Sequence, residues 1–301
     1  MENVGTNGQE VSFGGVEAAE MSEMSGMVEK IEADLKSISF VNTDTIKKQI
    51  KKIVSKQNDF QIKAMKQDDW WNVLNKSGKP VNYMIANIAE LGEAVDSVDY
   101  KWWGKPEIDN LENFIVEGID ALHFCISYHL HITCGNLEVL DEPMEFAALA
   151  VDASNLDTAK FGENRREALY DALIHFNGYS SLVYMNMVSM ESVEDQTEEW
   201  KQNILELIYN TYKNLFAMLY LAGVIDFDEI ERRYMVKNAL NNVRKMNGYE
   251  NGTYVKTWLS PVGLEYEDNV VALNVIHNAG ITDFDEIVVA LDTYYKENAG
   301  I

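Results

Sequence analysis

The chain has 301 residues and a formal net charge of −24 at pH 7. A surface this acidic repels the phosphates of DNA and of anionic membranes, so we expect neither a nucleic acid polymer nor a membrane as partner. A small phosphorylated ligand is compatible with this charge only where a basic cluster or a divalent cation separates its phosphates from the carboxylates.

The cysteine content and the first residues indicate the compartment. Cys125 and Cys134 are too few for a disulfide scaffold and suit a reducing environment. No apolar stretch is long enough to span a membrane, and the opening MENVGTNGQE lacks the basic and apolar regions of a signal peptide. We therefore expect a cytoplasmic protein, in the host cytoplasm if the protein is viral.

Helix-forming residues dominate the chain. It contains only four prolines, and the stretches between them are rich in Leu, Ala, Glu, Lys and Met, which have high helix propensity. We predict an all-α fold, an antiparallel helical bundle that carries a helical insertion.

The first half of the chain contains the start of the predicted helical core. Residues 1–26 are rich in Gly, Ser, Glu and Met without a helical period, which predicts a flexible acidic tail. Residues 27–135 form the first part of the core, because apolar residues recur there every three or four positions. Within it, residues 81–103 and 111–134 are helical segments joined by a short Gly/Pro link, which favours an antiparallel hairpin.

The second half alternates between irregular and helical sequence. Residues 136–199 are acidic and interrupted by Pro and Gly, and we interpret them as a helical insertion. Residues 200–269 form the second part of the core, with a Gly- and Asn-rich loop at 247–252. A C-terminal helix, beginning after Asp283, is predicted for residues 270–301.

Two acidic pairs with helical spacing lie in the predicted hairpin. Glu90 and Glu93 are three residues apart in its first helix, as are Glu117 and Asp120 in its second, so each pair shares one helical face. Solvated acids are the simpler explanation of any single pair in a chain with 49 acidic residues. Both pairs lie in apolar sequence, however, which favours a buried cluster of carboxylates stabilised by a hard cation such as Mg²⁺.

A basic cluster in the second half meets the requirement for a phosphorylated ligand. Lys237, Arg244 and Lys256 lie near one another in a chain poor in basic residues. Gly248 and Gly252 flank the intervening loop and would let the backbone approach phosphate oxygens. The alternative is a solvated helix end followed by an ordinary turn.

The arrangement of these residues resembles the dimeric dUTPases, a family of all-α NTP pyrophosphohydrolases. In the first half the resemblance rests on Glu90-x-x-Glu93, Lys101-Trp102-Trp103, Glu117-x-x-Asp120 and Leu122-His123-Phe124. In the second half it rests on Lys237 to Arg244, Asn247 to Lys256, Trp258 and Glu267-Asp268-Asn269. The carboxylate motifs alone are also similar to MazG-like proteins and to phage dCTP pyrophosphatases.

The resemblance implies a role for each group. The catalytic residues, which would also bind two or three Mg²⁺ ions, are Glu90, Glu93, Glu117 and Asp120. The deoxynucleoside triphosphate substrate would be contacted by Trp103, Lys237, Asn241, Arg244, Tyr249 and Lys256. Gln67 lies near the position from which the family reads the uracil edge, and the family further implies a homodimer.

Three aromatic or imidazole side chains also have structural interpretations. Trp103 would otherwise fill the core, and Tyr249 would pack on its own turn. His123, a single histidine on an apolar helical face, is interpreted as structural.

Hydrolysis of dUTP to dUMP and pyrophosphate is the predicted reaction. Mg²⁺ held by the carboxylates would activate a water that attacks phosphorus, and the basic cluster would neutralise charge on the leaving pyrophosphate. Two alternatives stay open. One is a dCTP or dual dCTP/dUTP pyrophosphatase of the phage type, and the other is a non-enzymatic acidic helical protein that binds a partner.

Overall fold

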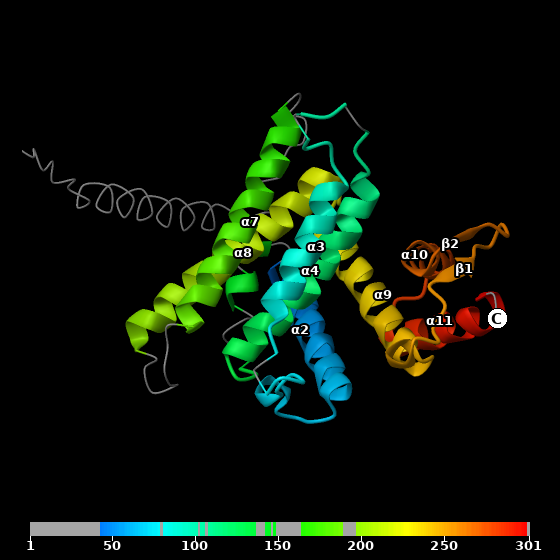
Figure 1. Cartoon of the computed structure of the whole chain (residues 1–301), viewed down its shortest axis with the longest axis horizontal. Coiled ribbons are helices and arrows are strands. Elements are labelled where there is room, and N and C mark those ends of the chain that lie inside the picture. Colours follow the sequence, from blue (N-terminus) through cyan, green and yellow to red (C-terminus); the bar gives the residue numbers. More distant parts are fainter. Residues whose placement is uncertain are drawn as a thin grey trace, which may run out of the picture. The chain divides into compact units, whose positions relative to one another are not determined.

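The structure is a computed structural model, and it describes residues 43–78, 81–101, 103–105, 108–136, 142–145, 147–148, 164–188 and 197–299. These residues are mostly helical and include a two-stranded hairpin, so the predicted all-α class is confirmed (Figure 1). None of the described helices is long and apolar enough to cross a membrane. The tail predicted at 1–26 and the helical start predicted from residue 27 to residue 42 lie outside the described residues.

Helix α2, Thr43–Met65, is the first described element, and the 3₁₀ helix η1, Trp70–Asn72, follows it. The apolar stripe of α2 is buried, and its residues recur every three or four positions: Ile46, Ile50, Ile53 and Val54. Gln57 and Gln61 are buried on the same helix. With Gln49, which is also buried, α2 therefore brings three amide side chains into the interior.

Helices α3, Tyr83–Asp96, and α4, Leu111–Ile132, form the hairpin that the sequence predicts. Asn82 and Asn110 cap their N-termini, each accepting backbone N–H donors at its side-chain oxygen. The backbone N–H of Asn110 donates to the carbonyl of Ser97 over 2.7 Å, which joins the end of α3 to the start of α4. The second half of α3 therefore lies beside the first half of α4.

Helix α8, Glu198–Ala222, approaches α4 closely. A Cβ atom on Gly118 of α4 would lie 2.7 Å from Cδ2 of Leu219, so a larger residue there would require the Leu219 side chain to move. Helix α7, Arg165–Val188, packs against α8 and belongs to the insertion predicted at 136–199. The insertion is therefore helical in this described part.

Helix α9, Phe227–Met246, packs against α2, α4, α10 and α11, and so links the first helices to the C-terminal region (Figure 1). The 3₁₀ helix η4, Tyr249–Asn251, follows it between two left-handed glycines, Gly248 with φ 89° and Gly252 with φ 70°. The loop predicted at 247–252 thus contains the backbone conformations that favour glycine.

The C-terminal region contains a hairpin and two helices. Its elements are β1 Thr257–Leu259, the antiparallel β2 Glu265–Glu267, α10 Asp268–Ala279 and α11 Phe284–Asn298. The sequence predicts one helix for 270–301, whereas the structure has two. The reason is local: Gly280, with φ 65°, ends α10, and the side chain of Asp283 caps the start of α11. The hairpin was also not foreseen in the predicted second part of the core.

Candidate active site

Three carboxylates from α3 and α4 come together. Glu90 and Glu93 lie about one turn apart on α3, and Glu117 lies on the part of α4 that runs beside them. One carboxylate oxygen from each residue lies within 4.8 Å of the other two. Oxygens at such distances can share one Mg²⁺ or Ca²⁺ ion, whose bonds to oxygen are about 2.0 to 2.6 Å long. The donor set therefore fits a hard divalent cation.

Burial and mutual repulsion change the acidity of this cluster. Burial raises the pKa of Glu90 to about 7, and the negative charges of Asp120, Glu117 and Glu93 contribute to the shift. Burial also raises the pKa of Glu117, with the charge of Asp120 as the next cause. At neutral pH Glu90 is therefore partly protonated, and a divalent cation would compete with that proton.

Asp120 differs from the three glutamates in its partner. Its Oδ2 lies 2.6 Å from Nζ of Lys237 on α9, and both side chains are largely buried. Asp120 is not among the residues whose oxygens meet within 4.8 Å, although its charge raises the pKa of Glu90 and of Glu117. The fourth predicted carboxylate thus lies at the edge of the cluster and connects it to α9.

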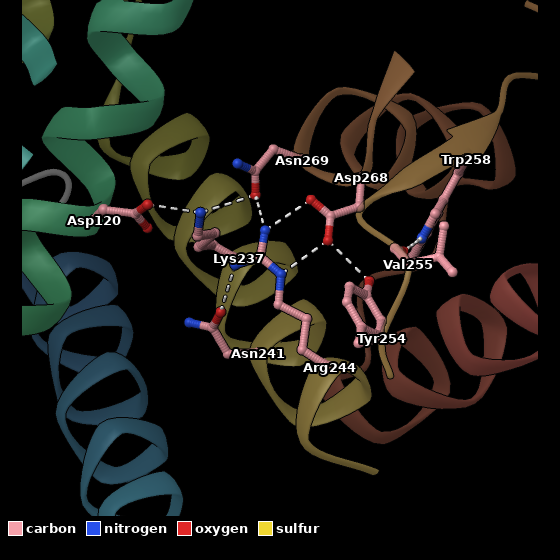
Figure 2. A network of polar contacts seen from close by, with 9 residues as sticks. All are labelled: Asp120, Lys237, Asn241, Arg244, Tyr254, Val255, Trp258, Asp268 and Asn269. Carbon is pink, nitrogen blue, oxygen red and sulfur yellow. Dashed lines mark hydrogen bonds and ion pairs between the residues drawn. The ribbon is translucent and has the colours of Figure 1, made fainter. Parts of the chain in front are cut away.

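Two largely buried cations, Lys237 and Arg244, share an acceptor at the start of α10 (Figure 2). Nζ of Lys237 donates to Oδ1 of Asn269 over 2.8 Å, and Nη2 of Arg244 donates to the same oxygen over 3.1 Å. Nη1 of Arg244 donates to Oδ1 of Asn241 over 3.3 Å. Two members of the predicted basic cluster therefore lie within reach of one amide oxygen.

Asp268 binds another edge of the Arg244 guanidinium. Nε of Arg244 donates to Oδ2 of Asp268 over 2.9 Å, and Nη2 donates to Oδ1 over 2.7 Å. Burial lowers the pKa of Arg244, but the hydrogen bonds and charge of Asp268 outweigh this effect and raise it above its usual range. Arg244 therefore stays positively charged although it is largely buried.

A pocket of about 330 Å³ is lined by two of the carboxylates and by both cations, whereas Glu93 and Glu117 do not line it. Its charged lining residues are Glu90, Asp120, Lys237, Arg244, Lys245 and Glu250, and Asn241 also lines it. Its other lining residues include Gln57, Phe60 and Gln61 of α2, His123 and Phe124 of α4, and Tyr249. The pocket thus offers cations to an anionic group and aromatic surface to a planar ring.

His123 lines this pocket and has one ring nitrogen without a partner among the described residues. Its Nδ1 lies 2.8 Å from the carbonyl oxygen of Ile119, which can only accept, so Nδ1 carries the hydrogen. Burial lowers the pKa of His123 to about 4, so the ring is neutral at pH 7. Nε2 is buried and has no hydrogen-bond partner among the described residues. His123 is buried and its ring stacks on Tyr234 with 4.0 Å between centroids, which agrees with the structural interpretation made from the sequence.

Gln67 does not line the pocket. Helix α2 ends before it, so Gln67 lies in the next turn, where its Nε2 donates to the carbonyl of Asp69 over 3.1 Å. Gln57 and Gln61 line the pocket instead, and their Nε2 atoms donate to Oγ of Ser127 over 2.7 Å and 2.9 Å. The two glutamines are four residues apart, which was the available signal that they share one face of α2.

Of the other residues predicted to contact the substrate, Tyr249 lines the pocket, whereas Trp103 and Lys256 do not. Trp103 is 63% exposed, packs edge-on against Tyr100 with 6.0 Å between ring centroids, and does not line the pocket. Tyr249 does line it, and its ring centroid lies 6.0 Å from Cζ of Arg244 and 5.7 Å from Nζ of Lys256. Lys256 thus contacts a pocket residue without lining the pocket itself.

Comparison with known proteins identifies one matching family. A family model described as dUTPase matches residues 49–249, which is more than half of the chain. The match includes the three clustered glutamates, Lys237 and Arg244, and it ends before Asp268 and Asn269. No curated protein matches the chain significantly in sequence.

Proposed function

Because the chain belongs to the dUTPase family, we propose that it hydrolyses dUTP to dUMP and pyrophosphate in the presence of Mg²⁺. The observation that carries the proposal is that one member of a carboxylate cluster lines a pocket that two largely buried cations also line. Glu90 belongs both to the cluster and to the pocket lining, which Lys237 and Arg244 share. A triphosphate needs this combination, because its charges cannot approach carboxylates without cations between them.

The carboxylates provide the metal ligands in this proposal. Glu90, Glu93 and Glu117 would hold Mg²⁺, and Asp120 would join them if Lys237 turned to a phosphate. Bound Mg²⁺ would supply a nucleophile by lowering the pKa of a water, and would neutralise phosphate charge. The family resemblance implies two or three ions.

The cations would act on the leaving group. Arg244 is held by Asp268 and is therefore oriented before substrate arrives, whereas Lys237, bound to Asp120 and Asn269, would exchange Asp120 for a phosphate. Oriented donors stabilise charge that develops in the transition state, and removal of one such donor typically costs about 10²- to 10³-fold in kcat. Pyrophosphate is the group on which that charge would appear.

The neutral His123 supports a pyrimidine base with a donor on its edge. The N3–H of uracil is such a donor, and Nε2 of His123, a residue of the pocket lining, is a buried acceptor that would become available if a neighbouring pocket side chain moved as the base entered. The amino group of cytosine would also donate to this atom, so dCTP is the alternative substrate. A homodimer, a cytoplasmic location and the contact of Trp103 with the base, expected from the sequence, stay predictions.

Pyrophosphate release from each of dUTP, dCTP, dTTP, dATP and dGTP, with and without Mg²⁺, tests the proposal. A Glu93→Gln variant removes one clustered carboxylate. A Glu112→Gln variant is the matched control, because Glu112 also lies on the hairpin but pairs at the surface with Arg233.

We expect Mg²⁺-dependent release from dUTP that is lost in Glu93→Gln and retained in Glu112→Gln. Faster turnover of dCTP would move the assignment to the phage-type alternative. If no nucleotide releases pyrophosphate, the enzymatic proposal is wrong and the partner-binding alternative gains support.

A further inference from the structure

We propose that Asp268 is a positioning residue, whose buried carboxylate, supported by Tyr254, holds the Arg244 guanidinium in the orientation that meets the substrate phosphates. The inference rests on the proposed function and extends the site into the C-terminal region. Asp268 itself would not touch the substrate. It would act only through Arg244.

Three hydrogen bonds stabilise the carboxylate of Asp268, which solvent barely reaches. Asp268 is 1% exposed, and its oxygens accept from Nε and Nη2 of Arg244 and, over 2.8 Å, from the hydroxyl of Tyr254. A buried carboxylate is strongly unfavourable unless it is paired and hydrogen-bonded. Two parallel N–H···O bonds also fix the plane of the guanidinium, which a single contact would not do.

The hydrogen bonds that Arg244 makes within the protein determine which of its N–H donors are left for a ligand. A guanidinium has five N–H donors. Among the described residues, Asp268 takes two of them, Asn269 takes one on Nη2 and Asn241 takes one on Nη1. One hydrogen on Nη1 is left, and the Asn241 contact at 3.3 Å is long enough to be exchanged for a phosphate oxygen. Arg244 and Asn241 both line the pocket, so Nη1 is the atom that we assign to the phosphates.

The first residues of α10 hold both cations, Lys237 and Arg244, in position. Asn269, the neighbour of Asp268, accepts from Lys237 and from Arg244 at the same oxygen (Figure 2). Tyr254 is itself held, because its ring stacks on Tyr295 of α11 with centroids 4.8 Å apart. The C-terminal region, which lies beyond the part of the chain that the family model matches, therefore carries residues on which the geometry of the cations depends.

A purely structural role and a positioning role of Asp268 predict different effects of its replacement. In that case its replacement would lower the melting temperature and leave kcat/KM of the folded protein unchanged. A positioning role predicts a loss in kcat/KM, because displacement of a catalytic group by about 1 Å can cost on the order of 10²-fold.

The experiment compares Asp268→Asn with the matched control Asp292→Asn. Asp292 also accepts from a cation and an amide, Lys296 and Asn247, but it does not contact Arg244. For each variant we would measure the melting temperature, kcat and KM with Mg²⁺ and dUTP, and the binding of inorganic pyrophosphate with Mg²⁺ by calorimetry.

We expect Asp268→Asn to lose about 10- to 100-fold in kcat/KM and to bind pyrophosphate more weakly, while Asp292→Asn keeps both values. In an Arg244→Gln background, Asp268→Asn should cause no further loss, because the two residues act as one unit. Unchanged kinetics of Asp268→Asn, or losses that multiply in the double variant, would overturn the proposal.

Two further results keep the test decisive. If Asp268→Asn does not fold, Tyr254→Phe replaces it in the test, because this variant keeps the ring stack and removes one donor to the carboxylate. A few-fold loss in kcat/KM of Tyr254→Phe supports the proposal, and no loss refutes it. If the wild type hydrolyses no nucleotide, the proposed function fails. Pyrophosphate binding that is weakened in Asp268→Asn would then still support the role of Asp268, and no pyrophosphate binding by the wild type would refute it.

Discussion

Replacing Glu90 with Gln should stabilise the metal-free protein at alkaline pH. At pH 8 the Glu90 carboxylate is ionised although it is half-buried and close to Asp120, Glu117 and Glu93, and these are the causes that raise its pKa to about 7. Gln has nearly the same shape and no charge. The substitution therefore removes a repulsion that protonation relieves at lower pH and that a bound cation would relieve at pH 8.

The pKa of Glu90 determines the sign and size of the effect. Its value in the folded protein lies above the usual 4.5, so the folded protein binds this proton more strongly than the unfolded chain does. The free energy of unfolding of the wild type therefore falls as pH rises from about 4.5 to about 7, and this contribution is constant at higher pH. The pKa difference corresponds to at most about 3 kcal/mol. Because solvent still reaches part of the side chain, screening reduces this to about 1 to 2 kcal/mol.

Urea unfolding of the wild type and of Glu90→Gln at pH 5 and pH 8, in EDTA, measures this difference. We expect similar stabilities at pH 5, where Glu90 is protonated, and a variant more stable by about 1 to 2 kcal/mol at pH 8. Saturating Mg²⁺ at pH 8 should reverse the order, since a ligand at about 100 times its Kd stabilises by about 2.7 kcal/mol. A variant that is less stable than the wild type at pH 8 without metal would refute the reasoning.

Three other substitutions test separate parts of the site and fold. Lys237→Met leaves Asp120 without its cation, and we expect kcat for pyrophosphate release from dUTP to fall about 10²- to 10³-fold in steady-state assays. His123→Phe keeps an aromatic ring and removes the acceptor, so KM for dUTP and for dCTP should rise about tenfold. Arg166→Gln removes a partly exposed ion pair with Asp109, and urea unfolding should show a loss below about 1 kcal/mol.

Each of these expectations has a contrary result. Normal kcat in Lys237→Met would show that this cation does not act on the leaving group. Normal KM in His123→Phe would exclude Nε2 as a contact of the base. A loss well above 1 kcal/mol in Arg166→Gln would show that the tie between α7 and the loop before α4 is stronger than a surface pair.

Local sequence patterns predicted the elements that carry the carboxylates. Spacing of three within helix-forming, apolar segments was enough to place Glu90 and Glu93 on one face of α3, and the Gly/Pro link was enough to predict the hairpin that brings Glu117 beside them. Helix periods and hairpin links are properties of neighbouring residues, so they can be read from one sequence.

The partners of these residues could not be read in the same way. Lys237 and Asp120 are far apart in the chain, and their ion pair depends on how α9 packs against α4. The exact end of α2, which removes Gln67 from the pocket, depends on capping and tertiary contacts, which local propensity determines poorly. The acceptor on His123 depends on which ring nitrogen faces the Ile119 carbonyl. Such pairings need the folded structure.

A crystal structure with Mn²⁺ and a non-hydrolysable imido analogue of dUTP tests most directly whether these residues form one active site. We expect anomalous peaks within about 2.0 to 2.6 Å of carboxylate oxygens of Glu90, Glu93 and Glu117, the uracil beside His123, and phosphate oxygens in contact with Lys237 and Arg244. Metal bound elsewhere, or a nucleotide outside this pocket, would contradict the assignment.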